Sequence, residues 1–289
     1  MTSEEDLRAI RRGYARQVMA AARKSDTRVE DAFAQTPREH FLGPGPWPIL
    51  RFGDDYVFSP SDDPVYLYGN DLVGIAPERR INNGQPSLHA YVLCEAALRP
   101  GDHAVHIGAG VGYYTALMAH LVGASGRVTG IEFEPDLAAR ARANLSDRRN
   151  VGVIEGDGTL APFDPADVIY VNAGATRPAD VWLNRLNDGG RLVLPLTTNK
   201  GFTGPDAGPI QRRGAVFLIT RRGEDFLARW ISPVAIYPCH GMRDEASERA
   251  LAAAFQNDDW RRVTRLYRRD DLPEAQCWLR APGWSLAYQ

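Results

Sequence analysis

Cysteine is scarce in this sequence, and the few thiols follow no recognisable pattern. The 289 residues include three cysteines, Cys94, Cys239 and Cys277, which lie far apart. Their odd number argues against a framework of disulfides, and their spacing does not match that of structural metal sites. We therefore expect no metal centre, and we expect a reducing compartment, the cytoplasm, as the location.

Long apolar runs and a strong charge of one sign are also missing. No stretch approaches the roughly 18 apolar residues of a membrane-spanning helix, and the first residues are polar and acidic, unlike a secretory signal. The formal net charge is −2, so no overall field favours nucleic acid or an anionic membrane. We expect a protein that binds neither, and the sequence leaves its oligomeric state open.

The sequence does contain a regular alternation of short apolar strands and helices. The expected strands are 103–107, 128–133, 151–155, 168–172 and 191–196. The expected helices between them are 113–121, 135–145 and 179–186. Such an order is typical of a parallel sheet with helices on both faces. Two further strands, 215–220 and 226–231, flank a Gly223-Glu224 turn and indicate an antiparallel hairpin. We expect an α/β fold with a doubly wound, mostly parallel, seven-stranded Rossmann-like sheet that ends in an antiparallel hairpin.

The segment before this sheet is expected to form helices and a lid. Residues 4–24 and a segment around Val29 and Phe33 show helical periodicity. Residues 43–86 mix glycine, proline and aspartate with aromatic residues and are expected to be irregular, which is typical of a loop that covers a ligand.

The segment after the sheet is expected to add a helical pair and a hairpin. The second helix would carry Trp260, Val263 and Tyr267, and the hairpin would turn near Gly283. The glycine-rich stretch 201–214 is either a substrate gate or a plain surface loop. The expected division is N-terminal helices and lid 1–95, Rossmann-like domain 96–240 and C-terminal appendage 241–289.

A glycine-rich turn follows the first strand of the expected sheet. Gly108-Ala109-Gly110-Val111-Gly112 leads into a helix, and glycines at this place let the backbone approach a ligand closely. The spacing is G-x-G-x-G, and Tyr113 stands where dinucleotide-binding enzymes have their third glycine. Alone, this turn is a weak signal for a nucleoside site.

Two acidic residues after the next two strands sharpen that signal. Glu132 closes the second strand, where a carboxylate can accept both ribose hydroxyls, and Asp157 follows the third, where it can accept from an adenine amino group. Ligands of such sheets bind at the carboxyl ends of the strands. An acid about 20 residues after the glycines also suits NAD, but the glycine spacing and Asp157 argue against a nicotinamide nucleotide.

Together with their neighbours, these motifs resemble the protein-L-isoaspartate O-methyltransferase family. The resemblance covers roughly residues 29–240 and rests on segments 29–33, 36–42, 99–102, 107–113, 156–158, 161–164 and 189–195. It implies the methyltransferase version of the Rossmann-like sheet, S-adenosyl-L-methionine as cofactor, and an O-methyltransferase that modifies an isoaspartyl-like carboxylate on a protein or peptide. The cofactor-binding residues that we expect are His106, Gly108, Ala109, Gly110, Gly112, Tyr113, Glu132, Phe133, Asp157, Gly158 and Asn172. His106 stands where the family usually has an acid, so it is either a tolerated histidine or a changed contact to the methionine part of the cofactor.

The expected acceptor loop, residues 81–89, departs from the family. The family has a Thr-Ile-Ser-x-Pro-like loop whose serine lies beside the reacting methyl group; if Pro86 aligns with the family proline, Gly84 replaces that serine. The catalytic candidates are Asn82, Asn83, Gln85 and His89. A carboxylate acceptor is ionised at pH 7 and needs no base, whereas an amine or hydroxyl acceptor would be helped by one.

Three other functions stay open on the sequence. The first is a divergent family member that methylates a dedicated peptide or small-molecule partner. The second is a catalytically silent binding protein that keeps the cofactor fold, and the third is an RNA methyltransferase. The acidic balance of charge argues against the last of these.

Overall fold

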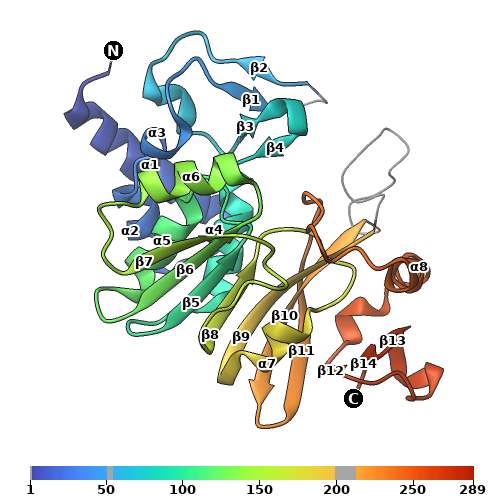
Figure 1. Ribbon diagram of the computed structural model, residues 1–289. Helices are drawn as coiled ribbons and strands as arrows, with labels where there is room; N and C mark the ends of the chain where they lie inside the picture. Colours follow the sequence, from blue (N-terminus) through green and yellow to red (C-terminus); the bar gives the residue numbers. More distant parts are fainter. Residues whose placement is uncertain (1, 51–54, 199–212) are drawn as a thin grey trace. The chain divides into compact units, whose positions relative to one another are not determined.

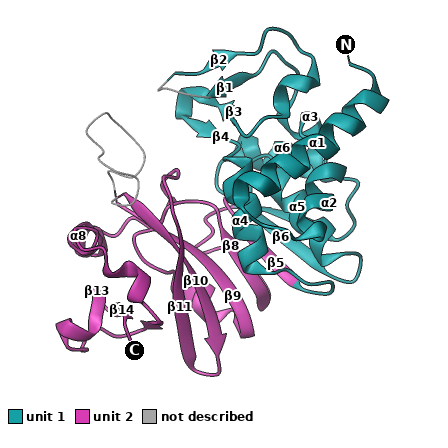
Figure 2. Cartoon of the chain, turned by 180° about the vertical axis from the view of Figure 1, so that it is seen from behind, with its two compact units in different colours: residues 1–102, 109–155 teal, residues 103–108, 156–289 magenta. Residues whose placement is uncertain are grey.

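The computed structural model describes residues 2–50, 55–198 and 213–289. The chain divides into two compact units, coloured separately in Figure 2. Unit 1 combines residues up to 102 with 109–155, and unit 2 combines 103–108 with 156–289. A short part of the expected lid and most of the glycine-rich stretch 201–214 lie outside the described residues.

Unit 1 begins with the helices that the sequence predicts. Its helices are α1 (Glu4–Ala22), α2 (Thr27–Gln35), α3 (Glu39–Leu42), α4 (Pro86–Ala96), α5 (Tyr113–Val122) and α6 (Pro135–Asn144). The Ser3 hydroxyl accepts from the backbone N–H of Asp6 and so caps α1. Val29 and Phe33 on α2 are buried, which confirms the apolar face expected there.

A small antiparallel sheet stands where the sequence predicts an irregular lid. Its strands are β1 (Pro48–Leu50), β2 (Val57–Phe58), β3 (Leu72–Ala76) and β4 (Ile81–Asn82), in the order β2-β1-β3-β4. Two short 3₁₀ helices, η1 (Pro64–Leu67) and η2 (Pro77–Arg79), lie between them. Trp47, Ile49, Leu67 and Val73 share a buried cluster with Leu42. The prediction was wrong because strands of two to five residues are too short to show a reliable alternation.

The rest of unit 1 is a parallel pair of strands with the helices that precede each of them. β6 (Arg127–Glu132) pairs in parallel with β7 (Val151–Glu155), and Glu132 lies opposite Glu155 at the carboxyl ends. α5 connects the glycine turn to β6, and α6 connects β6 to β7. Pro135 occupies the first turn of α6, where its missing N–H has no cost.

Unit 2 contains the first, fourth and fifth parallel strands of the expected sheet and the hairpin that follows them. Its first elements are β5 (His103–Ile107), β8 (Ala166–Val171), α7 (Asp180–Asn184), β9 (Leu186–Thr197), β10 (Gly214–Arg222) and β11 (Asp225–Pro233). β5, β8 and β9 are parallel, whereas β9, β10 and β11 are antiparallel neighbours (Figure 1). The α/β class, the parallel strands and the antiparallel hairpin are therefore confirmed.

The C-terminal segment extends this sheet, so the β10–β11 hairpin is not its edge. It comprises α8 (Glu245–Ala254), η5 (Asp259–Arg262), β12 (Arg265–Tyr267), η6 (Glu274–Gln276), β13 (Cys277–Ala281) and β14 (Trp284–Ala287). Within unit 2 the strand order is β13-β14-β12-β11-β10-β9-β8-β5.

The predicted second C-terminal helix is wrong, whereas the predicted final hairpin is confirmed. Trp260 lies in the short η5, and Tyr267 lies in β12, which pairs with β11. Apolar residues three to four positions apart suit a helix, but the same spacing arises where a 3₁₀ turn continues into a strand. Of the helices in the described ranges, none is both long enough and apolar enough to cross a membrane.

Candidate functional site

The glycine turn in unit 1 holds the predicted ribose-binding acid in place. The backbone N–H of Gly110 donates to Oε2 of Glu132 at 2.6 Å, and the N–H of Glu134 donates to Oε1 at 3.0 Å. Gly110 and Gly112 have φ of +57° and +93°, a conformation that favours glycine. Backbone donors therefore hold both oxygens of the Glu132 carboxylate.

Burial sets the electrostatics of Glu132. Its side chain is 6% exposed, and loss of water raises the pKa of this carboxyl, while the backbone N–H groups act in the opposite direction. An ionised carboxylate offers about four acceptor positions, and the backbone N–H groups of Gly110, Glu134 and Phe133 occupy part of them. The group therefore still fits a ligand that brings a hydroxyl donor.

A hydrogen bond to one carboxylate oxygen orients Asp157 in unit 2, and the other oxygen can still accept a hydrogen bond. The backbone N–H of Thr159 donates to Oδ1 at 2.8 Å. Among the described residues, no donor lies on Oδ2, and this oxygen is not completely covered. A partly buried carboxylate with one fixed and one unused oxygen fits a ligand with a single amino donor.

The glycines nearest β5 in unit 2 have no room for side chains. A Cβ on Gly108, which has φ of +76°, would lie 3.1 Å from the carbonyl oxygen of Asn172. A Cβ on Gly158 would lie 2.4 Å from Cγ2 of Ile107. The Asn172 amide also donates to the Gly108 carbonyl at 3.3 Å. Gly108 therefore packs against the backbone of Asn172 and Gly158 against the Ile107 side chain, so both positions at the end of β5 require glycine.

The remaining predicted cofactor residues differ widely in exposure. His106 is completely buried, its ring meets Tyr170 edge-on, and burial lowers its pKa to about 3. Tyr113 is also fully buried, Ala109 is nearly so, and Phe133 is 41% exposed. The cofactor contacts of these four residues, like those of the other predicted residues, stay predictions.

The predicted acceptor loop in unit 1 is organised around Gly84. The N–H of Gly84 donates to Oδ1 of Asn82 at 2.9 Å, and Gly84 has φ of +71°. A Cβ on Gly84 would lie 2.3 Å from Nε2 of His89. The His89 imidazole therefore occupies the space that any side chain at residue 84 would need.

Two further features of this loop concern Asn83 and Tyr114. Nδ2 of Asn83 is buried and has no acceptor among the described residues, and Gln85 stands at the N-cap position of α4. The ring of Tyr114 stacks on His89, with centroids 3.6 Å apart and planes 17° apart, and its hydroxyl lies 3.4 Å from the Gly84 carbonyl. The sequence analysis missed Tyr114, because its position beside His89 comes from tertiary packing of α5 against the loop.

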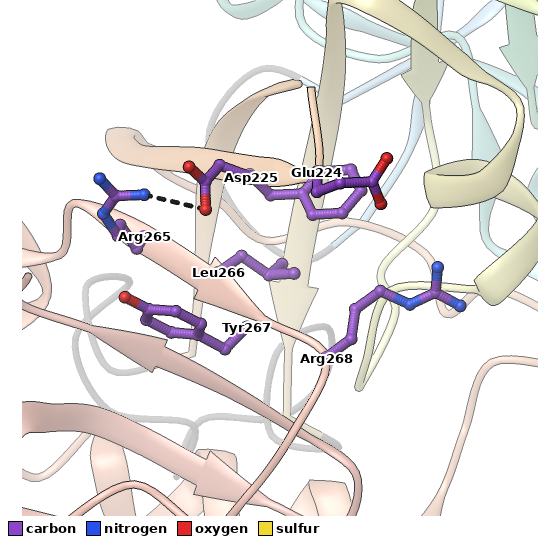
Figure 3. Close-up of a pocket in the computed structure, with 7 residues that line it drawn as sticks. Glu224, Asp225, Arg265, Leu266, Tyr267 and Arg268 are labelled. Carbon is purple, nitrogen blue, oxygen red and sulfur yellow. Dashed lines mark ion pairs between the residues drawn. The ribbon is translucent and has the colours of Figure 1, made fainter. Parts of the chain in front are cut away.

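One polar niche in unit 2 contains none of the predicted site residues. It is lined by the β10–β11 turn and by β12, from Glu224 to Phe226 and from Arg265 to Arg268. Figure 3 shows Arg265 directed toward Asp225, with which it forms an ion pair at 3.3 Å, whereas Arg268 points away. Arg268 instead contacts Asn184 and Asp180. Since its charged groups already pair with the protein, we assign no function to it. The described ranges contain no group of three His, Cys, Asp or Glu side chains that could hold a metal ion.

Comparison with known proteins gives the relatives of this chain. The family model described as Protein-L-isoaspartate(D-aspartate) O-methyltransferase matches residues 15–203. The chain is 36% identical over 157 residues to the protein-L-isoaspartate O-methyltransferase of Ignicoccus hospitalis, covering 53% of this chain and 69% of that protein. It is 30% identical over 172 residues to the Thermotoga maritima protein of the same name, covering 58% of this chain and 50% of that protein.

Solved structures agree on the fold. A protein-L-isoaspartate O-methyltransferase structure has a TM-score of 0.59 at 23% identity, covering 82% of this chain and 69% of the other. A putative Plasmodium falciparum enzyme, in complex with S-adenosyl-L-homocysteine, has a TM-score of 0.61 at 18% identity, covering 79% and 97%. The sequence relatives are covered only in part, and residues 204–289 lie beyond the family model. Because the family model spans more than half of the chain, the protein belongs to the protein-L-isoaspartate O-methyltransferase family of S-adenosylmethionine-dependent methyltransferases.

Proposed function

We propose that this protein transfers the methyl group of S-adenosylmethionine to an isoaspartyl-like carboxylate on a protein or peptide. The proposal rests on the orientation and the remaining acceptor capacity of two carboxylates, those of Glu132 and Asp157, in a chain of this family. Glu132 and Asp157 are each oriented by backbone N–H groups and each retain acceptor capacity. The isoaspartyl acceptor is taken from the names of the relatives. We further propose that the reaction serves repair or modification of proteins in the cytoplasm.

The chemistry of these donors and acceptors fits the cofactor. Glu132 would accept from a ribose hydroxyl, and Asp157 Oδ2 would accept from the adenine amino group. Gly108 and Gly110 let the backbone approach the ligand, since neither carries a side chain. The cofactor, when bound, supplies a methyl group already activated by its sulfonium. The protein's task is then mainly to align donor and acceptor, since alignment alone removes much of the barrier.

On the acceptor side, we propose roles for Asn82, Asn83, Gln85 and His89. The buried Nδ2 of Asn83 has no acceptor among the described residues, so it can donate to a carboxylate or peptide carbonyl of the substrate. An unmade bond of this kind costs about 1–3 kcal/mol, which a bound acceptor would recover. An ionised carboxylate acceptor requires no general base at pH 7, so His89 is assigned a positioning role against Tyr114.

Methyl-ester formation tests the acceptor. The full chain, saturated with S-adenosylmethionine, should form base-labile methyl esters on an isoaspartyl peptide and none on the matching aspartyl peptide. Asn83→Leu should reduce this turnover while leaving cofactor affinity unchanged, since Asn83 is assigned to the acceptor. Cofactor binding without turnover of any isoaspartyl peptide would exclude this acceptor.

Calorimetry with S-adenosylhomocysteine tests the cofactor residues. Glu132→Ala and Asp157→Ala should each weaken binding by about 10- to 150-fold, because a hydrogen bond to a charged group is worth about 1.5–3 kcal/mol. Asp147→Ala, an exposed acid after α6, is the matched control and should bind as the unaltered chain does. Unchanged affinity in both site variants would overturn the assignment of the cofactor residues.

A dedicated peptide or small-molecule acceptor is the second candidate function. It is favoured by the loop at Gly84, where the His89 ring fills the space that a side chain would take. Tight cofactor binding without isoaspartyl turnover would support it, whereas efficient turnover of several unrelated isoaspartyl peptides would exclude it.

A further inference from the structure

Asp157 contacts a turn near the end of the chain that contains none of the predicted site residues. We refer to residues 239–242 as the 239–242 turn. Gly241 in this turn has φ of +76°, and a Cβ built on it would lie 2.4 Å from Oδ2 of Asp157 and 3.1 Å from its Cγ. The backbone of the turn therefore lies directly against the carboxylate.

Hydrogen bonds fix the 239–242 turn to the segment that follows β8. The N–H of Cys239 donates to the Gly174 carbonyl at 2.8 Å. The Thr176 N–H and hydroxyl both donate to the Met242 carbonyl at 2.9 Å. Cys239 and Met242 are each only 5% exposed. The turn is thus a built part of unit 2, and its position against Asp157 does not depend on a loose loop.

The next residue ties the turn to the end of β9. The Arg243 guanidinium donates to the carbonyls of Gly174 and Thr197 at 3.1 and 3.0 Å, and it also pairs with Glu248 on α8. This anchor involves carbonyls at the carboxyl end of β9, the edge at which ligands of α/β sheets bind. The turn therefore reaches Asp157 from the ligand-binding edge of unit 2.

We propose that the 239–242 turn forms a wall of the nucleoside site at Asp157 and limits that carboxylate to a single amino donor. The proposal rests on the proposed function, since it takes Asp157 as the acceptor for an adenine-type amino group. Gly241 covers one side of Oδ2 with backbone atoms and leaves no room for a side chain there. Excluding water from one side of an acceptor strengthens the bond made on its other side. The turn lies beyond residues 15–203, the part that matches the family model.

The test compares two glycines of similar backbone conformation in the full chain. Gly241→Ala places a methyl group against Asp157, whereas Gly283 has φ of +77° and no atom within 4 Å of the position that a Cβ would take, so Gly283→Ala carries the backbone strain alone. By calorimetry with S-adenosylhomocysteine, we expect Gly241→Ala to weaken binding about tenfold, which is what weakening one hydrogen bond to a charged acceptor would cause. Gly283→Ala should bind like the unaltered chain. Equal affinities of the two alanine variants would overturn the proposal.

Asp157→Ala separates this proposal from the proposed function. If Asp157→Ala weakens binding and Gly241→Ala does not, the cofactor assignment stands and the wall is refuted. If Asp157→Ala leaves the affinity unchanged, the assignment of Asp157 to the cofactor fails, and the wall fails with it, whereas the proposed methyl transfer is decided separately by methyl-ester formation. In the Asp157→Ala background, Gly241→Ala should cause no further loss of affinity, because the carboxylate that it displaces is gone.

Hydrogen exchange of the unaltered chain keeps the proposal testable if Gly241→Ala does not fold. Saturating S-adenosylhomocysteine should slow amide exchange in the 239–242 turn, while exchange in the β13–β14 turn at Gly283 should not change. Unchanged exchange in the 239–242 turn would refute the wall.

Discussion

Gly84→Ser places a side chain in the space that the His89 ring occupies. The Cβ position at residue 84 lies 2.3 Å from Nε2 and 2.9 Å from Cδ2 of His89. His89 cannot simply rotate away, because its ring stacks on Tyr114 at 3.6 Å and the side chain is 4% exposed. The substitution therefore forces the loop, the imidazole or α5 to shift.

Two separate costs make up the expected loss of stability. A residue with a side chain in the left-handed region costs about 1–2 kcal/mol, and this applies because φ at Gly84 is +71°. Forcing extra atoms into a packed site costs about 1–3 kcal/mol more. Gly283→Ser is the matched control, since φ is +77° there and nothing lies within 4 Å of the Cβ position. The control should lose the first amount only.

Thermal unfolding of the full chain measures the difference between the two serine variants. The steric part corresponds to about 2–12 °C in melting temperature, at about 2–4 °C per kcal/mol for domains of 150–250 residues. Adding His89→Ala should recover most of this difference, so the pair should show a coupling energy of about 1–3 kcal/mol. If Gly84→Ser melts at the same temperature as Gly283→Ser, or if His89→Ala restores nothing, the ring does not fill this space.

Three further outcomes are expected from groups outside the loop. Burial lowers the pKa of His106 from 6.5 to about 3, so the folded state keeps the ring neutral while the unfolded chain binds a proton below pH 6.5. In urea titrations the free energy of unfolding of the unaltered chain should therefore fall by about 2 kcal/mol relative to that of His106→Asn between pH 7.5 and 5. A difference that stays constant with pH would contradict this. Trp278→Ala should cost about 3–5 kcal/mol, since the indole is 6% exposed and donates to the Ala254 carbonyl at 3.1 Å; a loss below about 1 kcal/mol in the same assay would mean that the C-terminal hairpin does not contribute to the core. Arg79→Ala should cost at most about 1 kcal/mol, because its bidentate pair with Asp136 is largely at the surface, and an effect that persists in high salt would show that charge is not its cause.

The sequence by itself determined the elements whose signals are local. The strand 103–107 and the glycine turn after it depend on a short apolar run followed by closely spaced glycines, and both are found where predicted. Pro135 at the start of a helix and the two-residue turn at Gly223-Glu224 are equally local. Such signals can be read because a few adjacent residues decide the backbone conformation.

The tertiary structure alone decided the contacts between residues that are far apart in the chain. The four-stranded sheet of residues 48–82 and the strand β12 are stabilised by pairing with distant partners, so their own short sequences carry little signal. The stacking of Tyr114 on His89 and the approach of Gly241 to Asp157 have the same origin. Side-chain packing depends on the three-dimensional neighbours of a residue, which periodicity and spacing along the chain do not specify.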